Sequence, residues 1–317
     1  MSNKQPEVYF YVPYADALQV REDKEKYTYA NGIASRRKFL KSPLNYIGGK
    51  YKLLPQLIEF FPDKINTFVD LFSGGFNVGI NVDCNKVVCN DMNTFIIDLY
   101  KELYSKPIDE TLNKITGRIN EYGLSKENEG AFKKFRNYYN KTKEPIDLYT
   151  LSCYSFNYQF RFNNNKEYNN PFGRNRSQFS DNMKSNLILF TEKLKSMNVE
   201  FLSEPFDKVD LSKLNSEDFV YCDPPYLITT GSYNDGNRGF KDWKEEEEIQ
   251  LYKVLDELNK RKVKFALSNV IEHKGKENVL LKEWSKKYKT IYLTSDYSNS
   301  SYNTKRDKSI EVLIINY

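Results

Sequence analysis

Histidine and paired cysteines are nearly absent from this 317-residue chain. His273 is the only histidine, and the four cysteines, Cys84, Cys89, Cys153 and Cys222, form no C-x-x-C pair. A metal centre built on these residue types and a disulfide framework are therefore not expected. We predict four buried, reduced thiols and no bound metal.

Long apolar runs are also missing. No stretch approaches the roughly 20 residues that a membrane span needs, and the first six residues, Met1 to Pro6, are polar rather than an apolar signal segment. These two absences predict a cytoplasmic protein with no membrane partner. The hydrophobic content of 39% supports a real core, and the length allows one large domain or a core with an insertion.

A strong net charge is absent as well, since the total is only +5. The positive charge is nevertheless concentrated between Lys133 and Arg176, where nine Lys or Arg residues face three Asp or Glu residues. The same segment is rich in Asn, Tyr and Phe. Basic residues interleaved with aromatics and amides are typical of nucleic-acid surfaces. A solvated loop region is the alternative, but it explains the aromatics less well.

The rest of the chain is organised around a short strand that ends in Asp-Pro-Pro-Tyr. Residues 219–222 are aromatic, β-branched or small and predict a buried strand. Pro224 and Pro225 stop the ladder because neither donates a backbone hydrogen bond. Asp223 then lies at the carboxyl end of a strand, where open α/β sheets bind ligands. With free proline carbonyls and the ring of Tyr226, it suits a planar ring that carries an amino group. A proline turn with a surface tyrosine is the alternative.

A second predicted strand, Phe68–Phe72, precedes a glycine loop, Ser73–Gly79, that we expect to open a helix. The loop is not the G-x-G-x-x-G fingerprint, so NAD is not favoured. The strand Val87–Asp91 follows and ends in an acid 21 residues after Asp70. An acid in this position of a Rossmann-like sheet accepts hydrogen bonds from ribose hydroxyls, so the pattern predicts a nucleoside site. A helix cap is the alternative role for Asp91.

A third ligand-binding pattern lies earlier, in Leu44–Lys50. Its paired glycines would let backbone amides approach a ligand, and Lys50 supplies a cation for a carboxylate or phosphate. Tyr51–Phe61 has apolar residues at helical spacing and ends at Pro62. Alone this pattern is also common in turns.

The remaining segments alternate between the two regular structures. We predict helices at Ile96–Leu103, Ile108–Ile119, Phe132–Tyr139, Ile146–Phe156, Asn186–Met197, Glu245–Leu258 and Val279–Lys287. We predict strands at Val199–Leu202, Lys264–Ser268, Thr290–Thr294 and Glu311–Tyr317, a hairpin at Phe160–Arg174 and a loop at Thr229–Gly239. This alternation predicts a doubly wound sheet. Its last two strands should be antiparallel because no helix joins them. Residues 1–43 could form a strand pair, a flexible arm or a DNA contact.

In this order, the segments from about Leu44 to Tyr317 resemble the Dam-like, or alpha-group, N6-adenine DNA methyltransferases. Five motifs carry the resemblance. They are Asn45–Leu54 (first cofactor motif), Asp70–Gly75 (glycine motif), Asn90-Asp91 (ribose acid), Arg161–Asn163 with Asn169–Arg174 (recognition hairpin), and Thr304–Arg306 with Glu311–Tyr317 (closing segment). The Asp-Pro-Pro-Tyr strand stands between the hairpin and the closing segment, as in that family.

The resemblance implies an α/β fold: a Rossmann-like, doubly wound mixed sheet of the class I methyltransferases with an inserted, mainly helical target-recognition region. Residues 44–104 and 198–317 would form the catalytic domain that binds S-adenosylmethionine. Residues 105–197 would form the DNA-binding region, and residues 1–43 would be an extension of unknown role.

The implied reaction transfers the methyl group of S-adenosylmethionine to N6 of an adenine flipped out of double-stranded DNA. The catalytic residues would be Asp223, Pro224, Pro225 and Tyr226. The cofactor-binding residues would be Tyr46, Gly49, Lys50, Asp70, Phe72, Ser73, Gly74, Gly75, Asp91, Phe206 and Asp223. The DNA-binding residues would be Asn45, Arg161, Asn163, Asn165, Lys166, Pro171, Arg174 and Lys305.

Two departures from the family bear on the target. Residues 1–43 exceed the usual short leader, and Asn164-Asn165-Lys166 stands where the family often has a basic residue that recognises a guanine. GATC is the default site that the family implies, but the recognised sequence stays open. Methylation of RNA or of a protein amide and a catalytically inactive DNA-binding module are the alternatives. We expect a monomer, and the sequence does not decide whether a restriction endonuclease accompanies it.

Overall fold

One ten-stranded sheet runs through the computed structural model, which describes residues 8–10, 28–29, 38–229, 243–294 and 309–317. The strands lie side by side in the order β2-β1-β9-β10-β7-β6-β3-β4-β5, and β8 pairs with β7. Their bounds are β1 (Val8–Phe10), β2 (Thr28–Tyr29), β3 (Thr67–Asp70), β4 (Lys86–Asn90), β5 (Val199–Leu202), β6 (Phe219–Cys222), β7 (Lys264–His273), β8 (Lys276–Glu277), β9 (Lys289–Leu293) and β10 (Ser309–Ile315).

Five neighbouring strands, β5, β4, β3, β6 and β7, are parallel. β10 inserts between β7 and β9 and runs antiparallel to both. The predicted Rossmann-like mixed sheet and the antiparallel pairing of its last two strands are therefore confirmed. β3 lies at the switch point, because the chain builds outward from it first to β4 and β5 and later to β6 and β7. Loops at the carboxyl ends of the strands diverge at such a point and leave a crevice for a ligand.

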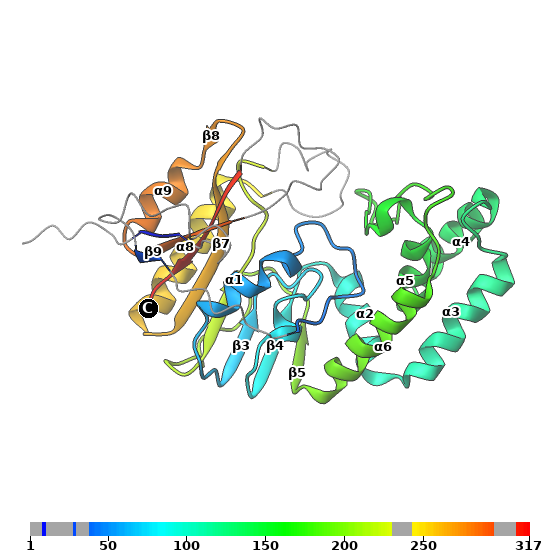
Figure 1. Cartoon of the computed structure of the whole chain (residues 1–317), viewed down its shortest axis with the longest axis horizontal. Coiled ribbons are helices and arrows are strands. Elements are labelled where there is room, and N and C mark those ends of the chain that lie inside the picture. Colours follow the sequence, from blue (N-terminus) through cyan, green and yellow to red (C-terminus); the bar gives the residue numbers. More distant parts are fainter. Residues whose placement is uncertain (1–7, 11–27, 30–37, 230–242, 295–308) are drawn as a thin grey trace, which may run out of the picture.

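Helices cover both faces of the sheet (Figure 1). Their bounds are α1 (Leu54–Glu59), α2 (Thr94–Ser105), α3 (Ile108–Tyr122), α4 (Glu129–Thr142), α5 (Pro145–Cys153), α6 (Asp181–Ser196), α8 (Glu245–Lys260) and α9 (Val279–Ser285), with single 3-10 turns at η1 (Tyr51–Leu53), η2 (Gly79–Asn81) and η3 (Phe156–Tyr158). None of the helices in the described ranges has the length and apolar content to span a bilayer.

Alternate residues of the central strands contribute to two hydrophobic clusters. In β6, Phe219 and Tyr221 face the cluster shared with α1 and α2, whereas Val220 and Cys222 face the cluster shared with α8 and α9. This alternation follows from the period of two along a strand. β6 is buried on both faces, as its unbroken run of apolar and aromatic residues predicts.

Helices α3 to α6 gather beyond the β5 side of the sheet (Figure 1). Their centre is α5, which contacts α2, α3 and α4. Every residue from Ile146 to Cys153 is buried, including the charged Asp147, whose Oδ1 pairs with Arg118 Nε of α3 at 3.0 Å. Pro145 lies in the first turn of α5. A proline is tolerated there because a backbone N–H at that position would have no acceptor within the helix.

The predicted hairpin Phe160–Arg174 is present in a short form. An antiparallel bridge joins Phe162 to Tyr168, and backbone hydrogen bonds run from Asn163 N to Glu167 O and from Asn169 N to Arg161 O. Two local predictions are wrong. The glycine loop opens no α-helix, because only the 3-10 turn η2 lies between β3 and β4. Cys84 is half-buried, while the other three cysteines are buried as expected.

Part of the amino-terminal segment joins the sheet. β1 pairs parallel with β9, and β2 pairs with β1 at the sheet edge, which agrees with the strand-pair alternative for these five residues. Asn81 then fixes residues 38–43, since its side chain accepts from Leu40 N and donates to Leu40 O at 2.8 and 2.7 Å. The predicted loop beyond Thr229, together with Lys305 and the rest of Thr304–Arg306, lies outside the described residues.

Candidate active site

The carboxyl ends of three parallel strands open onto one cavity of about 640 Å³. Asp70 ends β3, Asp91 follows β4 and Asp223 follows β6, and all three line it. Every residue predicted for catalysis or cofactor binding lines the same cavity. The fold therefore brings together, from distant parts of the sequence, the motifs that the sequence could only place in order.

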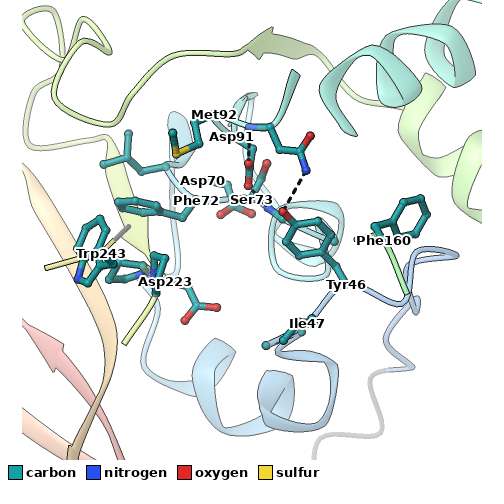
Figure 2. A pocket seen from close by; sticks show the side chains of 18 of the residues that line it. Tyr46, Ile47, Asp70, Phe72, Ser73, Asp91, Met92, Phe160, Asp223 and Trp243 are labelled. Atoms are coloured by element: carbon teal, nitrogen blue, oxygen red, sulfur yellow. Dashed lines mark hydrogen bonds between the residues drawn. The ribbon is translucent and has the colours of Figure 1, made fainter. Parts of the chain in front are cut away.

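Asp223 holds two donors (Figure 2 shows its place in the cavity). Its Oδ2 forms a 2.8 Å ion pair with Lys50 Nζ, and its Oδ1 accepts a 2.9 Å hydrogen bond from the Tyr226 hydroxyl. Burial raises the pKa of Asp223, and the charge and hydrogen bond of Lys50 oppose that shift. A carboxylate has about four lone-pair sites, so each oxygen retains one for a ligand.

Lys50 is buried and has three neighbours in the cavity. Besides Asp223, its ammonium donates to Gly48 O at 2.8 Å and lies 5.1 Å from the centre of the Tyr226 ring. From the sequence, Lys50 was predicted to bind the cofactor as a cation for a carboxylate or phosphate. The structure places it on the aspartate of the Asp-Pro-Pro-Tyr strand, so the first motif and the catalytic strand meet through one ion pair.

Asp91 organises the glycine loop. Its Oδ2 accepts from Gly74 N and its Oδ1 from Asn93 N, both at 2.8 Å. Burial raises the pKa of Asp91, and these two N–H donors oppose the shift. The N-cap of α2 is Asn93, so the alternative role of Asp91 as the cap of that helix is wrong.

Asp70, at the end of β3, is also buried. Burial, together with the charges of Asp223 and Asp91, raises its pKa to about 8, although the hydrogen bond from Gly79 N opposes the shift. The cavity lining contains six acidic residues and two basic ones, which are Asp70, Asp91, Glu204, Asp207, Asp223 and Glu247, and Lys50 and Arg161. This charge balance favours a ligand that carries positive charge.

Close approach explains two glycines of the loop. Gly74 has φ +45°, and a Cβ added there would lie 3.0 Å from the Tyr46 ring. At Gly75 an added Cβ would lie 3.2 Å from both Tyr46 Cβ and Asn77 Nδ2. Both glycines were predicted to let backbone approach a ligand, but in this structure they make room for Tyr46. Figure 2 shows Tyr46 across the cavity from Phe72 and Trp243, with its hydroxyl accepting from Asn93.

Only part of the predicted DNA-binding set reaches the cavity. Arg161 and Pro171 line it, whereas Asn45 is exposed and donates to Asn157 O at 2.6 Å beside it. The side chain of Asn163 builds the turn of the loop, since its Oδ1 accepts from Asn165 N and Glu167 N. An amide used in this way has less capacity to contact a base.

Two basic residues of the predicted recognition hairpin (Phe160–Arg174, here called the recognition loop) lie outside the cavity. Lys166 and its neighbour Asn165 are exposed in the turn, and Lys166 has φ 58°. Arg174 is 67% exposed and pairs with Glu129 of α4. Lys166 and Arg174 therefore present charge at the surface and are accessible to DNA.

Sequence analysis missed several residues that line the cavity. Met92 and Asn93 follow Asp91, Asn77 lies in the glycine loop, and Phe160 and Trp243 close two opposite sides. Met92 and Asn93 could have been found from their position after the acid. Trp243 could not, because it comes from a separate segment at the start of α8.

Comparison with known proteins agrees with this geometry. Type II methyltransferase M.FokI of Planomicrobium okeanokoites is 62% identical over 279 residues, which are 88% of this chain and 43% of that protein. Modification methylase StsI of Streptococcus sanguinis is 55% identical over 287 residues, 90% of this chain and 44% of that protein. The chain therefore spans less than half the length of these two relatives.

A shorter relative matches along nearly its whole length. DNA adenine methylase of Escherichia coli (strain K12) is 27% identical over 288 residues, 89% of this chain and 96% of that protein. Residues 46–299, which include Asp70, Asp91 and Asp223, match the family of D12 class N6 adenine-specific DNA methyltransferases. The chain belongs to that family.

Proposed function

We propose that this chain methylates N6 of adenine in double-stranded DNA with S-adenosylmethionine as the methyl donor. The observation that carries the proposal is Asp223, which lies at the carboxyl end of β6 in the same cavity as Asp91. A base amine bound at Asp223 and the nucleoside part of a cofactor bound at Asp91 would therefore lie in the same cavity.

The cavity suits such a cofactor in size and charge. A volume of about 640 Å³ falls within the range of small-molecule sites. Asp91 has lone pairs for ribose hydroxyls beyond those that Gly74 and Asn93 use. The acidic lining of the cavity, which includes Asp91 and Asp223, complements a cationic ligand. When bound, S-adenosylmethionine supplies a methyl group on a positively charged sulfur.

The chain's own residues would prepare the amine. Inside a duplex N6 is paired and stacked, so the adenine must leave the helix at a cost of a few kcal/mol. Asp223 and the Pro224 carbonyl would accept hydrogen bonds from the two N6 hydrogens, which directs the nitrogen lone pair toward the methyl group. As N6 gains the methyl group and the carbon–sulfur bond breaks, N6 would release one of these protons to the Asp223 carboxylate or to solvent. Tyr226 would stack on the base. Catalysis would then depend on orientation and polarisation.

Residues 105–197 are the proposed target-recognition region, with Arg161, Lys166 and Arg174 as its basic contacts. The basic and aromatic segment Lys133–Arg176 supports this assignment. Its loop contacts the first cofactor motif through Asn45 and Asn157. We propose that the chain is a cytoplasmic monomer. It would either protect DNA from a separate restriction endonuclease or act without one.

The test is expression in a host that lacks its own adenine methylase, followed by long-read sequencing of modified bases. We expect N6-methyladenine at one sequence motif, which also identifies the target. Absence of the modified base from DNA of cells that contain folded protein contradicts the proposal. Methylated RNA or protein in the same cells supports the alternative substrates.

A further inference from the structure

Three aromatic rings from separate segments form one wall of the cavity. Phe72 follows β3, Phe206 follows β5 and Trp243 precedes α8. Ring centroids are 5.5 Å apart for Phe72 and Phe206, 5.6 Å for Phe72 and Trp243, and 5.5 Å for Phe206 and Trp243. Figure 2 shows Trp243 and Phe72 on the side of the cavity away from Tyr46 and Phe160. The ring planes are inclined to one another by 35°, 81° and 49° in the same order, so the three rings form an apolar corner in which one ring can contact the face of a planar ligand and another its edge.

Trp243 differs from the other two rings because a buried carboxylate holds it. Its Nε1 donates to Glu248 Oε2 at 2.5 Å, and Glu248 is fully buried. Phe72 and Phe206 have no polar atom on the ring, so packing alone orients them. A hydrogen bond to a charged acceptor is directional and strong, and it fixes the plane of the indole.

Glu248 has three further donors, all neutral. Its Oε1 accepts from the Tyr252 hydroxyl at 2.6 Å, from Asn269 Nδ2 at 2.9 Å and from Asn278 Nδ2 at 3.1 Å. These donors come from α8, from β7 and from the residue before α9. Burying a carboxylate is costly unless hydrogen bonds compensate. The network keeps the carboxylate rigid and connects the wall of the cavity to the sheet.

A purely structural role would need only the contacts on Oε1. Those three donors already join α8 to β7 and to the start of α9. The fourth donor, Trp243, is the one that lines the cavity. Asn269 also lies two residues beyond Leu267, the partner of Cys222, so the network is anchored at the same end of the sheet as Asp223.

We propose that Trp243 forms a wall for the adenine ring of S-adenosylmethionine and that Glu248 is the positioning residue that fixes the indole. This inference rests on the proposed function. Trp243 is far along the chain from the cofactor motifs, and Glu248 does not itself line the cavity. Loss of the carboxylate should weaken cofactor binding and leave the groups around Asp223 in place.

The chain contains a matched control. Trp284 is the second of its two tryptophans, both tryptophans are 7% exposed, and Trp284 Nε1 donates to Asp256 Oδ1 at 2.9 Å. Trp284 and Asp256 do not belong to the cavity lining. The variant Trp284→Phe therefore leaves Trp243 as the only indole fluorophore, and Trp243→Phe leaves Trp284.

The first measurement is tryptophan emission during titration with S-adenosylmethionine. We expect saturable quenching or a spectral shift in Trp284→Phe and no saturable change in Trp243→Phe. Unchanged emission in Trp284→Phe, at concentrations where calorimetry shows binding, overturns the wall assignment. The titration of Trp284→Phe leaves Trp243 and Glu248 unaltered, so it does not depend on whether a Glu248 variant folds.

The second measurement is steady-state methylation of DNA by Glu248→Gln and by the control Asp256→Asn. In Glu248→Gln we expect the KM for S-adenosylmethionine to rise about tenfold, the scale of one lost aromatic contact. The kcat should stay within about twofold, since Asp223 and Lys50 are untouched. Asp256→Asn should leave both constants unchanged.

An unchanged KM in Glu248→Gln, or an equal rise in Asp256→Asn, overturns the positioning role. Failure of the proposed function gives a different result: the wild-type chain would neither bind S-adenosylmethionine nor methylate DNA, and the inference would fall with it. Wild-type binding and methylation with unaltered variants would overturn the inference alone.

Discussion

At the scale of single residues, Asp223 combines two properties that usually oppose each other. It is buried enough for its pKa to be raised, yet Lys50 and Tyr226 stabilise its charged form through one donor on each oxygen. A carboxylate held in this way stays an acceptor and is oriented before a substrate arrives. Preorganised acceptors of this kind cost no rearrangement during reaction.

We predict that Asp223→Ala abolishes methyl transfer and leaves DNA affinity within a few-fold of wild type. In the proposed mechanism Asp223 contacts the reacting amine, whereas phosphate contacts supply most of the affinity for DNA. Methyl incorporation and equilibrium DNA binding measure the two effects. Turnover within about tenfold of wild type would remove Asp223 from catalysis.

A second residue-scale prediction concerns Asp70, whose pKa is raised from 3.8 to about 8 by burial. Between these values the folded chain keeps a proton that the unfolded chain has released. The contribution of Asp70 to the free energy of unfolding is therefore fully favourable below pH 3.8, and it falls as the pH rises to about 8. In Asp70→Asn the free energy of unfolding should therefore fall less steeply with rising pH over this range.

Urea unfolding of both proteins at several pH values between 5 and 8 measures the difference in slope. Asparagine keeps an acceptor for Gly79 N, so the control retains the hydrogen bond to the loop. Equal slopes for the two proteins would show that Asp70 is ionised in the folded chain at neutral pH.

At the scale of elements, the recognition loop is joined to its neighbours by polar and aromatic contacts rather than by a strand ladder. Phe162 stacks on Phe95 of α2 with centroids 4.7 Å apart. Lys143, just after α4, donates to Lys166 O at 2.7 Å and lies 5.3 Å from the Phe95 ring. The loop therefore packs on α2, the helix that follows Asp91, and α2 connects the proposed DNA-binding region to the proposed cofactor site.

The element-scale prediction concerns the two arginines of this loop. Arg161→Ala and Arg174→Ala should each cost about 1–3 kcal/mol and relax sequence choice if the arginine contacts a base. If it contacts only phosphate, binding should weaken evenly across sequences and the salt slope should fall. Binding to a panel of DNA sequences at several salt concentrations separates these results.

Glu129→Gln is the matched control for Arg174, because it removes the acidic partner and keeps the arginine. Its DNA affinity should equal or exceed that of wild type. If both arginine variants keep wild-type affinity and sequence choice, recognition lies in another part of the chain, such as residues 1–43.

At the scale of the whole molecule, the cavity collects the ends of three central strands, so a ligand there should stabilise the fold. Bound S-adenosylmethionine at 100 times its Kd should add about 2.7 kcal/mol to the free energy of unfolding. Asp91→Ala should weaken binding by about 1–3 kcal/mol, since it removes an acceptor for the ribose and leaves Gly74 N and Asn93 N without theirs.

Calorimetry on folded Asp91→Ala measures the affinity, and thermal unfolding with and without ligand measures the stabilisation. Both should decrease together, because they report one equilibrium. Unchanged affinity would leave Asp91 with a structural role only, as the residue that holds the glycine loop.

Sequence by itself determined the order of strands and helices, the strands that are buried on both faces and the acids at their ends. These features depend on local composition: β6 is apolar at every position, and Pro224 and Pro225 stop it at a defined residue. The period of hydrophobic residues likewise predicted α2, α3, α4 and α6 near their observed bounds.

Tertiary structure alone decided which side chains meet. Lys50 and Asp223 are 173 positions apart in the sequence, and their ion pair exists only because the sheet places the first motif beside β6. The same holds for Trp243 and Phe72. The missing helix after the glycine loop was also decided by tertiary contacts, since Gly74 donates its N–H to Asp91 and its neighbours pack against Tyr46. Local propensity is weak compared with such buried, directional contacts. For this reason the sequence pattern predicted which residue types form the site, whereas the tertiary structure determined which of them are in contact.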